Sequence, residues 1–244
     1  MIFDRAAIKP NDVPGPNTES RFFWIGSQPL LKVDITGNRF CNESTAYDFL
    51  PHTATMLPGN SYFTIWDDDL EQQIRQFDTK GCSRMFEHEN GAPPDIPFFV
   101  VKGMLEGLTN EGFITKADTI EGLATGLGLP VNAFRATVNR YNQLCASGED
   151  PDFGKEPHRL AQLGKPPYFG ARNCGYILCS LDGIRINTDM QALDSEKKPI
   201  EGLYVVGCDS GGFFAHTYPN LFTGICAGRI VTFGRRAGRI VATR

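Results

Sequence analysis

The sequence lacks the excess of positive charge that nucleic-acid-binding proteins usually show. Its 244 residues carry 24 Lys and Arg against 28 Asp and Glu, which gives a formal net charge of −4. The basic residues are scattered, apart from one cluster that we interpret as the solvated face of a last helix: Arg229, Arg235, Arg236 and Arg239. We therefore predict that the chain does not bind nucleic acid.

Long apolar runs, a secretory leader and paired metal-ligand motifs are also lacking. No apolar run approaches the roughly 20 residues that span a bilayer. The N-terminus MIFDRAAIKPNDVPGPN has no basic region followed by an apolar one. The seven cysteines include no CxxC pair, which fits neither a zinc ribbon nor a dense disulfide framework. We expect a cytoplasmic protein with reduced thiols, no membrane partner and no metal site.

Hydrophobic patterning indicates strands and helices in the first two thirds of the chain. The first 20 or so residues, rich in Pro, Asn and Asp, indicate an irregular lead-in. Segments 30–35 and 61–66 are typical of strands, and the acidic triplet 67–69 suits the start of a helix better than a divalent-metal site. Segment 99–108 is compatible with either a helix or a strand. Helical spacing is clearest at 119–128 and 131–147, where glycines supply the stops.

From Pro166 onward the pattern changes to one typical of strands. Short apolar runs at 176–181 and 183–187 flank Asp182-Gly183, which is a hairpin signal. The run GLYVVG at 202–207 indicates a buried strand, and the tail from Gly224 to Val241 has the length and small residues of a helix. We find no internal repeat and no low-complexity segment.

The segment after the last strand is rich in glycine, which is typical of places where the backbone lies close to a ligand. The strand ends at Gly207, a glycine pair follows at Gly211 and Gly212, and a helix then begins near Gly224. Glycines allow backbone amides to come near a cofactor, and a helix N-terminus favours partial negative charge. Glycines after a strand also serve ordinary tight turns, so this pattern alone leaves both interpretations open.

Four motifs in order give the segment its family context. IEGLYVVGCDSGGFFAHTYPNLFTGICAGRIVTFGRRAGRIV resembles the closing motif of the FAD-dependent fumarate reductase and succinate dehydrogenase flavoproteins, which include urocanate reductase and 3-ketosteroid dehydrogenases. GNRFCNES resembles the G.RF.NE element of that family, and TVNRYNQLCASGEDPDFGK resembles the end of its cap. PPYFGAR is similar to the strand that re-enters the FAD domain. The resemblance covers the chain from about Phe22.

The resemblance implies a mixed α/β fold and a division into three parts. Residues 1–30 would be an irregular lead-in that is a remnant of the FAD domain. Residues 31–155 would form an α+β cap over the substrate, and residues 156–244 the C-terminal part of a Rossmann-like FAD-binding domain. The G-x-G-x-x-G turn that binds the ADP half of FAD is not found. We therefore expect weak FAD binding by the chain alone and predict a separate N-terminal FAD-binding polypeptide as a partner.

The resemblance also suggests which residues act. Tyrosines serve as acids or carbonyl-polarising groups in the ketosteroid dehydrogenase relatives, which points to Tyr47 and Tyr218, with Arg75 as a third catalytic candidate. Glu43, His216 and Ser180 are the candidates for substrate binding, with Cys179 as an alternative to Ser180. The expected flavin contacts are Gly207, Asp209, Gly211, Gly212, Gly224 and Ile225. A buried tyrosine or a loop histidine also occurs without any such role.

The implied function is hydride transfer between FAD and a C=C or C–C bond next to a carbonyl, with a cap-domain acid or base. Fumarate reductases hold their dicarboxylate with arginines that this sequence does not clearly match, which favours a less polar small-molecule substrate. Two alternatives stay open. One is a catalytically silent fragment, and the other is a partner-binding or small-molecule-binding module that has lost FAD.

Overall fold

A computed structural model describes residues 2–46, 49–180, 182–214, 218 and 222–243. The chain divides into two compact units, Asp4–Tyr176 and a smaller one that comprises Ile177–Arg244 with Met1–Phe3. Each unit is described by itself. The predicted cap, residues 31–155, lies within the larger unit, and the predicted assignment of domains stays a prediction.

The larger unit is built on a six-stranded sheet with the order β2-β1-β6-β4-β3, to which β5 adds by pairing with β6. The pairs of β4 with β3 and β6, of β5 with β6, and of β1 with β2 are antiparallel. The strands are β1 (Ile2–Ile8), β2 (Ser20–Phe22), β3 (Leu31–Val33), β4 (Tyr62–Asp67), β5 (Ile114–Ala117) and β6 (Tyr168–Cys179).

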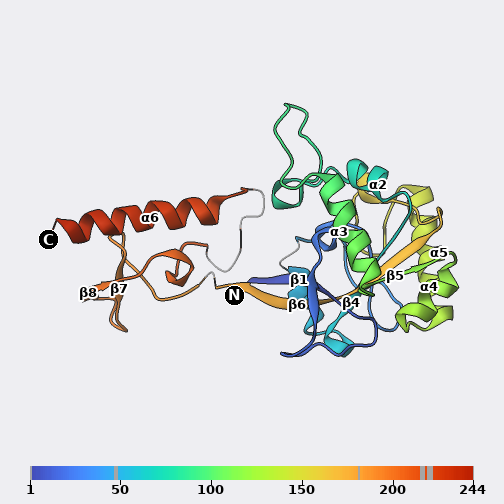
Figure 1. The fold of residues 1–244 in the computed structure, drawn as a ribbon, viewed down its shortest axis with the longest axis horizontal. Coiled ribbons are helices and arrows are strands. Elements are labelled where there is room, and N and C mark those ends of the chain that lie inside the picture. The colour runs from blue at the N-terminus through green and yellow to red at the C-terminus, as the bar shows by residue number, and fades with distance from the viewer. Residues whose placement is uncertain (1, 47–48, 181, 215–217, 219–221, 244) are drawn as a thin grey trace. The chain divides into compact units, whose positions relative to one another are not determined.

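Helices cover both faces of this sheet. Since successive side chains of a strand point to opposite faces, the side chains of β4 enter two different cores. Trp66 packs with the apolar faces of α2 (Leu70–Phe77) and α3 (Phe98–Asn110). Phe63 and Ile65 pack instead with α4 (Ile120–Leu127) and α5 (Val131–Ser147). Figure 1 shows α4 and α5 beside β5, and α3 across the sheet from them. A short helix, α1 (Phe49–Ala54), and the 3-10 turns η1 (Trp24–Ser27), η2 (Pro58–Asn60), η3 (Gly81–Ser83) and η4 (Pro157–Arg159) complete the unit.

The two clearest helices of the sequence are confirmed. In α5 the residues Phe134, Val138, Tyr141 and Leu144 are buried along one face, and Gly148 ends the helix with a φ of 72°. The side chain of Thr119 caps α4 by accepting a hydrogen bond from the amide of Gly122 at 3.0 Å. The open question at 99–108 is settled as a helix, α3. These helices follow from local periodicity and capping.

The acidic triplet acts differently from the expectation. Asp69 is the N-cap of α2, but its side chain makes no capping bond. Asp67 is buried instead, and its carboxylate accepts from the amides of Asp69, Gly164 and Lys165. The carboxylate therefore ties the helix start to a distant loop. Among the described residues, no group of His, Cys, Asp and Glu is arranged to hold a metal ion.

The irregular lead-in expected up to about residue 20 is wrong for its first part, since β1 forms at Ile2–Ile8, whereas residues 9–19 contain no strand or helix. Ala6, Ala7 and Ile8 are fully buried, and β1 takes its place in the sheet between β2 and β6. The sequence does not indicate this strand, because one of its two neighbours in the sheet, β6, comes more than 150 residues later and its described buried side chains are mostly small. Local sequence patterns carry no information about such a partner.

The smaller unit contains the hairpin of β7 (Gln191–Leu193) and β8 (Pro199–Tyr204), the turn η5 (Gly207–Asp209) and the helix α6 (Ile225–Ala242). The predicted C-terminal helix is confirmed as α6. The strand predicted from GLYVVG exists in part as β8, but the expectation that it is buried is wrong, because its residues are exposed except for a half-buried Tyr204. In the part of the chain that the structure describes, no helix is long and apolar enough to cross a membrane.

The hairpin predicted around Asp182-Gly183 is also wrong. Ile184 forms a parallel bridge with Ser210, and Ile186 an antiparallel bridge with Ala192. A Cβ atom on Gly183 would lie 2.0 Å from the carbonyl oxygen of Asp209. The glycine is therefore needed for a close crossing of two backbone segments, not for a hairpin turn.

Candidate functional site

The glycine-rich segment of the smaller unit folds into a compact turn directly after β8. Gly207 adopts a φ of 76° at the start of η5. Its carbonyl oxygen accepts from both the amide and the hydroxyl of Ser210, at 3.3 and 2.8 Å. Ser210 is fully buried as a result. The turn therefore satisfies its own polar groups, and Gly207 supplies a backbone conformation that other residues rarely adopt.

The backbone segment 183–184 lies against this turn and is hydrogen-bonded to it. The amide of Ile184 donates to the carbonyl of Asp209, and the amide of Gly211 donates to the carbonyl of Ile184, each at 2.9 Å. A Cβ atom on Gly211 would lie 2.5 Å from the carbonyl oxygen of Gly183. Two glycines thus let the segments 183–184 and 209–211 approach closely.

Arg229 joins the helix α6 to the same turn. Its Nη2 atom donates to the carbonyl oxygen of Ser210 at 2.5 Å and to the Ser210 hydroxyl. The guanidinium lies over the rings of Phe213, Phe214 and Phe233, with distances of 4.9, 5.4 and 5.4 Å to the ring centroids. The prediction of a uniformly solvated basic face is therefore wrong for Arg229, which is buried, whereas Arg235, Arg236 and Arg239 are not.

The structure brings most of the predicted site residues together in this unit. Tyr218 packs against Phe214, with a centroid distance of 5.6 Å, in a cluster that includes Ile225 and Cys226. The hydroxyl of Ser180 lies 3.2 Å from the carbonyl oxygen of Cys208. The predicted flavin contacts lie in the same unit: Gly207, Asp209, Gly211, Gly212, Gly224 and Ile225. His216 lies outside the described residues, and so does the side chain of Cys179.

The backbone here is suited to a flavin. Gly212 and Gly224 both have a φ of 82°, and a Cβ atom on either would meet no other described atom within 4 Å, so open space lies before these backbone positions. No side chain of a described residue caps the start of α6 after Gly224. The amide of Ile225 donates to the carbonyl of Phe222 at 3.3 Å, and the partial positive charge at the start of this long helix favours an electron-rich ligand edge. The residues therefore fit a flavin that is held by backbone amides.

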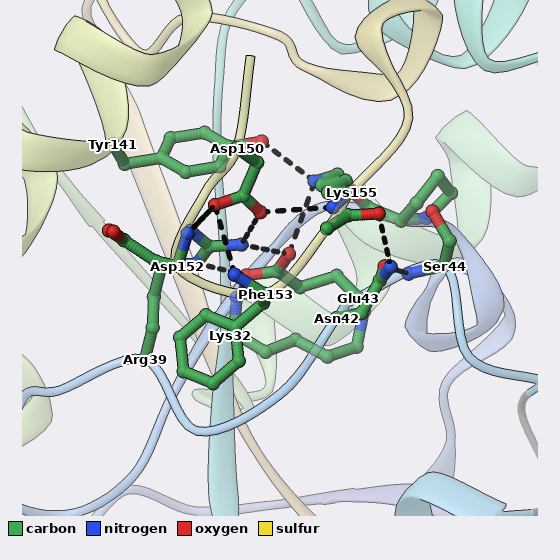
Figure 2. Close-up of polar contacts among 12 residues, drawn as sticks. Lys32, Arg39, Asn42, Glu43, Ser44, Tyr141, Asp150, Asp152, Phe153 and Lys155 are labelled. Carbon is green, nitrogen blue, oxygen red and sulfur yellow. Dashed lines mark hydrogen bonds and ion pairs between the residues drawn. The ribbon is translucent and has the colours of Figure 1, made fainter.

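The larger unit contains a buried ion cluster, shown in Figure 2, around the predicted site residue Glu43. Arg39 lies between two carboxylates. It donates to Glu43 at 2.8 and 2.9 Å, and to Asp150 at 2.8 and 3.2 Å. The Nζ atom of Lys155 lies 3.4 Å from Glu43 and donates to the Tyr141 hydroxyl at 2.7 Å. The side chains of Glu43, Asp150 and Lys155 are fully buried, and that of Arg39 is 5% exposed.

Burial and pairing shift the pKa values within this cluster in opposite directions. Burial alone would raise the pKa of Asp150, but the hydrogen bonds and charge of Arg39 outweigh it and lower the pKa to about 2. Burial lowers the pKa of Lys155 and raises that of Tyr141. Arg39 stays protonated, because the two carboxylates raise its pKa against the effect of burial. The cluster is thus held by a permanently charged guanidinium between two carboxylates.

The cluster fixes a segment that leads toward a predicted catalytic residue. The Asn42 side chain donates to the carbonyl of Gly154 at 3.0 Å and accepts from the amide of Ser44 at 2.8 Å. Tyr47 follows three residues later and lies outside the described residues. Glu43 has its carboxylate engaged by Arg39 and Lys155. In this arrangement Glu43 orients its neighbours, and its direct contact with a substrate stays a prediction.

Arg75 lies elsewhere in the larger unit. It projects from α2 with 59% of its side chain exposed, pairs with Glu71 at 3.2 Å, and lies 3.8 Å over the ring of Phe86. Arg75 lines a small cavity of about 150 Å³ together with Arg84 and Met85. It is not brought near Glu43 by any described contact, and its catalytic role stays a prediction.

Three residues of the ion cluster were not singled out by the sequence reasoning, although its motifs contain them. Arg39 belongs to GNRFCNES, whereas Asp150 and Lys155 belong to GEDPDFGK. The two motifs are separated by 111 positions at the Arg39–Asp150 pair. The signal was therefore present as two separate motifs, and only the fold shows that they form one charged cluster.

Comparisons with known proteins show the family to which the chain belongs. The family described as FAD binding domain matches residues 11–220. The chain is 33% identical over 221 residues to a vinyl phenol reductase of Lactiplantibacillus plantarum, covering 89% of this chain and 43% of the relative. It is 34% identical over 246 residues to a 3-oxosteroid 1-dehydrogenase of Mycobacterium tuberculosis, covering 86% and 38%. The chain thus spans less than half the length of each of these two curated relatives.

A solved structure of a flavoprotein is similar to this chain over nearly the whole of this chain's length. The open conformation of a flavocytochrome c3 fumarate reductase matches 97% of this chain and 36% of its own, with a TM-score of 0.61 and 27% identity. The fold and the matched profile define a flavoprotein, and the chain belongs to the FAD binding domain family. Within it, the relatives are the fumarate reductase and ketosteroid dehydrogenase flavoproteins, as the motifs predicted, and the cofactor is FAD.

Proposed function

We propose that the protein takes part in hydride transfer between FAD and a C=C or C–C bond next to a carbonyl group of a moderately apolar small molecule. The observation that carries this proposal is the gathering of Tyr218, Ser180 and the glycine-rich turn in one compact unit, at the start of α6. The relatives' names, a vinyl phenol reductase and a 3-oxosteroid 1-dehydrogenase, support a substrate with an activated carbon–carbon bond.

When bound, FAD supplies the hydride acceptor or donor, and the chain supplies orientation and proton management. Backbone amides at Gly212 and at the start of α6 would hold the flavin. The Tyr218 hydroxyl donates a hydrogen bond to the substrate carbonyl or moves a proton at the neighbouring carbon. Phe214, packed against Tyr218, limits the freedom of that ring.

Residues of the larger unit complete the proposal. Tyr47, which follows Ser44 by three positions in the chain, is the second candidate for proton transfer. Arg75 is retained as the third catalytic candidate, and His216 as a candidate for contact with the substrate. A separate N-terminal FAD-binding polypeptide and a cytoplasmic location also stay predictions.

The test is an anaerobic turnover measurement. The purified chain is loaded with FAD, reduced with dithionite and mixed with α,β-unsaturated ketones or carboxylates, and the visible absorbance of oxidised flavin is followed. We expect a substrate to speed the return of this absorbance, and Tyr218→Phe to slow it by about 100-fold or more. Tyr168→Phe, a change at a tyrosine of β6 to which no role is assigned, is the matched control.

Each negative outcome has its own meaning. Bound flavin that no unsaturated compound reoxidises would contradict hydride transfer at a carbon–carbon bond. Failure of the chain to bind FAD at all would instead favour the alternative of a binding module or silent fragment that has lost the flavin.

A further inference from the structure

Two thiols of the smaller unit lie close enough to react with each other. The Sγ atoms of Cys208 and Cys226 are 3.7 Å apart. Cys208 is the middle residue of η5, and Cys226 is the second residue of α6. A disulfide has an S–S distance of about 2.05 Å, so the two sulfur atoms need to approach by less than about 2 Å. Both side chains are partly buried.

The position of this pair in the chain is informative. The two cysteines are 18 positions apart and enclose residues 209–225. That segment contains Tyr218 and all predicted flavin contacts except Gly207. The backbone hydrogen bonds described within the smaller unit hold its beginning, through Asp209 and Gly211, to Ile184. A covalent link between Cys208 and Cys226 would fix both ends of the segment at once.

Three other cysteines of the chain have raised thiol pKa values and are therefore less reactive. Burial raises the pKa of the Cys41 thiol to about 12 and that of the Cys145 thiol to about 11, so both stay protonated and unreactive. Burial also raises the pKa of Cys174. Cys226 differs in its position, because it is the second residue of an 18-residue helix and its sulfur lies 3.7 Å from that of Cys208.

We propose that Cys208 and Cys226 form a redox-active dithiol, whose oxidation to a disulfide joins η5 to the start of α6. The oxidant is a low-molecular-weight disulfide of the glutathione class. The Cys226 thiolate attacks one sulfur of that disulfide, which breaks its S–S bond and releases one thiol. The Cys208 thiol then loses its proton and attacks Cys226 Sγ, which forms the internal S–S bond and releases the second thiol. The protein loses two hydrogens, and the small disulfide is reduced to two thiols.

The first experiment maps the cross-link in the intact chain. Wild-type protein is incubated with glutathione disulfide, quenched with an alkylating agent and analysed as non-reduced peptides by mass spectrometry. We expect a Cys208–Cys226 linked peptide and the loss of two alkylatable thiols per chain, both of which are reversed by dithiothreitol. Absence of this link, with both thiols alkylated or both carrying glutathione, would overturn the proposal.

Single substitutions separate the two steps. In Cys208→Ser the glutathione adduct on Cys226 should persist, because the resolving thiol is gone, and in Cys226→Ser the linked peptide should disappear. Cys82→Ser, a change at a partly buried cysteine of the larger unit, should leave the link unchanged. A stable Cys226 adduct in the wild type, with no transfer to Cys208, would contradict the assignment. None of these measurements needs FAD, so their failure is distinct from a failure of the proposed hydride transfer.

Discussion

In the larger unit, apolar side chains are buried on both faces of the sheet, whereas in the smaller unit the buried apolar residues among those described are Met190, Ala192, Phe214 and Ala237. Many large apolar side chains of the smaller unit are exposed instead, among them Leu203, Phe222 and Val231 at 43%, 67% and 69%. The larger unit is thus stabilised mainly by burial of apolar area. The smaller one depends on close backbone crossings and on Arg229.

The unit with the larger apolar core is not the one that contains most of the predicted site residues. Most of the predicted flavin and substrate contacts fall in the unit with the smaller core, where backbone segments rather than packed side chains set the geometry. Segments of low local stability are common at ligand sites, because they adjust when the ligand binds. The buried ion cluster, in contrast, lies in the unit with the larger core.

The largest expected effect comes from breaking the ion cluster of the larger unit. Arg39→Ala leaves two buried carboxylates without their partner, and we expect it to lower the free energy of unfolding by about 3–5 kcal/mol. Arg140→Ala is the matched control, because Arg140 also pairs with a carboxylate, that of Asp152, but at the surface. Its expected cost is below about 1 kcal/mol. Urea unfolding followed by far-UV circular dichroism measures both, and equal costs would show that burial of the pair is unimportant.

Hydrogen exchange tests the difference between the units in the unmodified protein. Amides of β4, which is buried along its whole length, should exchange only through extensive unfolding. Amides of the β7–β8 hairpin should exchange at least about 100-fold faster, since few apolar contacts oppose local opening. Mass spectrometry of peptides after timed labelling gives both rates. Equal protection in the two units would refute the comparison.

The pH dependence of the free energy of unfolding should reveal the contribution of the Asp150 carboxylate. Its pKa is depressed in the folded state, from 3.8 to about 2, so its contribution is present above pH of about 4 and is lost as the pH falls through about 2. The gap in unfolding free energy between wild type and Asp150→Asn should therefore shrink by about 2 kcal/mol between pH values of about 5 and 2. For Asp152→Asn, at the exposed pair, a much smaller change is expected, and a pH-independent gap for Asp150→Asn would contradict the proposed pairing with Arg39.

The smallest effect is expected at a helix cap. Thr119→Ala removes the hydroxyl that caps α4 and should cost about 1 kcal/mol. Thr125→Ala is the control, since the Thr125 hydroxyl bonds to the carbonyl of Glu121 inside the same helix and its loss should cost less than about 0.5 kcal/mol. Thermal unfolding of the two variants measures the difference. Equal costs would mean that the cap does not limit the stability of the larger unit.

What could be predicted from the sequence was local. The face formed by Phe134, Val138 and Tyr141 follows from helical spacing alone, and α6 follows from its length and small residues. The role of Gly183 could not be predicted, because the glycine is required by Asp209, a residue 26 positions away that only the fold brings near. The same is true of Arg39, whose second carboxylate lies in another motif.

The candidate site was predicted by resemblance more than by spacing. The glycine pair and the start of α6 were correctly located in the chain, but neither periodicity nor composition indicates that Arg229 is buried beneath the turn. Phe233 lies one turn along the same helix, but its other two aromatic neighbours, Phe213 and Phe214, come from the loop before α6, and their contact with Arg229 is not local. Arginine in a basic-looking helix is ordinarily solvated, so the exception required the structure.

The most direct test of the flavin site is an FAD titration of three proteins, followed by flavin fluorescence and visible absorbance. Wild type should bind FAD weakly but saturably. Gly211→Ala should lose at least about tenfold in affinity, because the added Cβ would lie 2.5 Å from the carbonyl of Gly183 and would displace the turn. Gly228→Ala, inside α6 with no described atom within 4 Å of the added Cβ, should bind as wild type does. Equal binding by all three proteins, or saturable binding by none, would contradict the placement of the flavin at this turn.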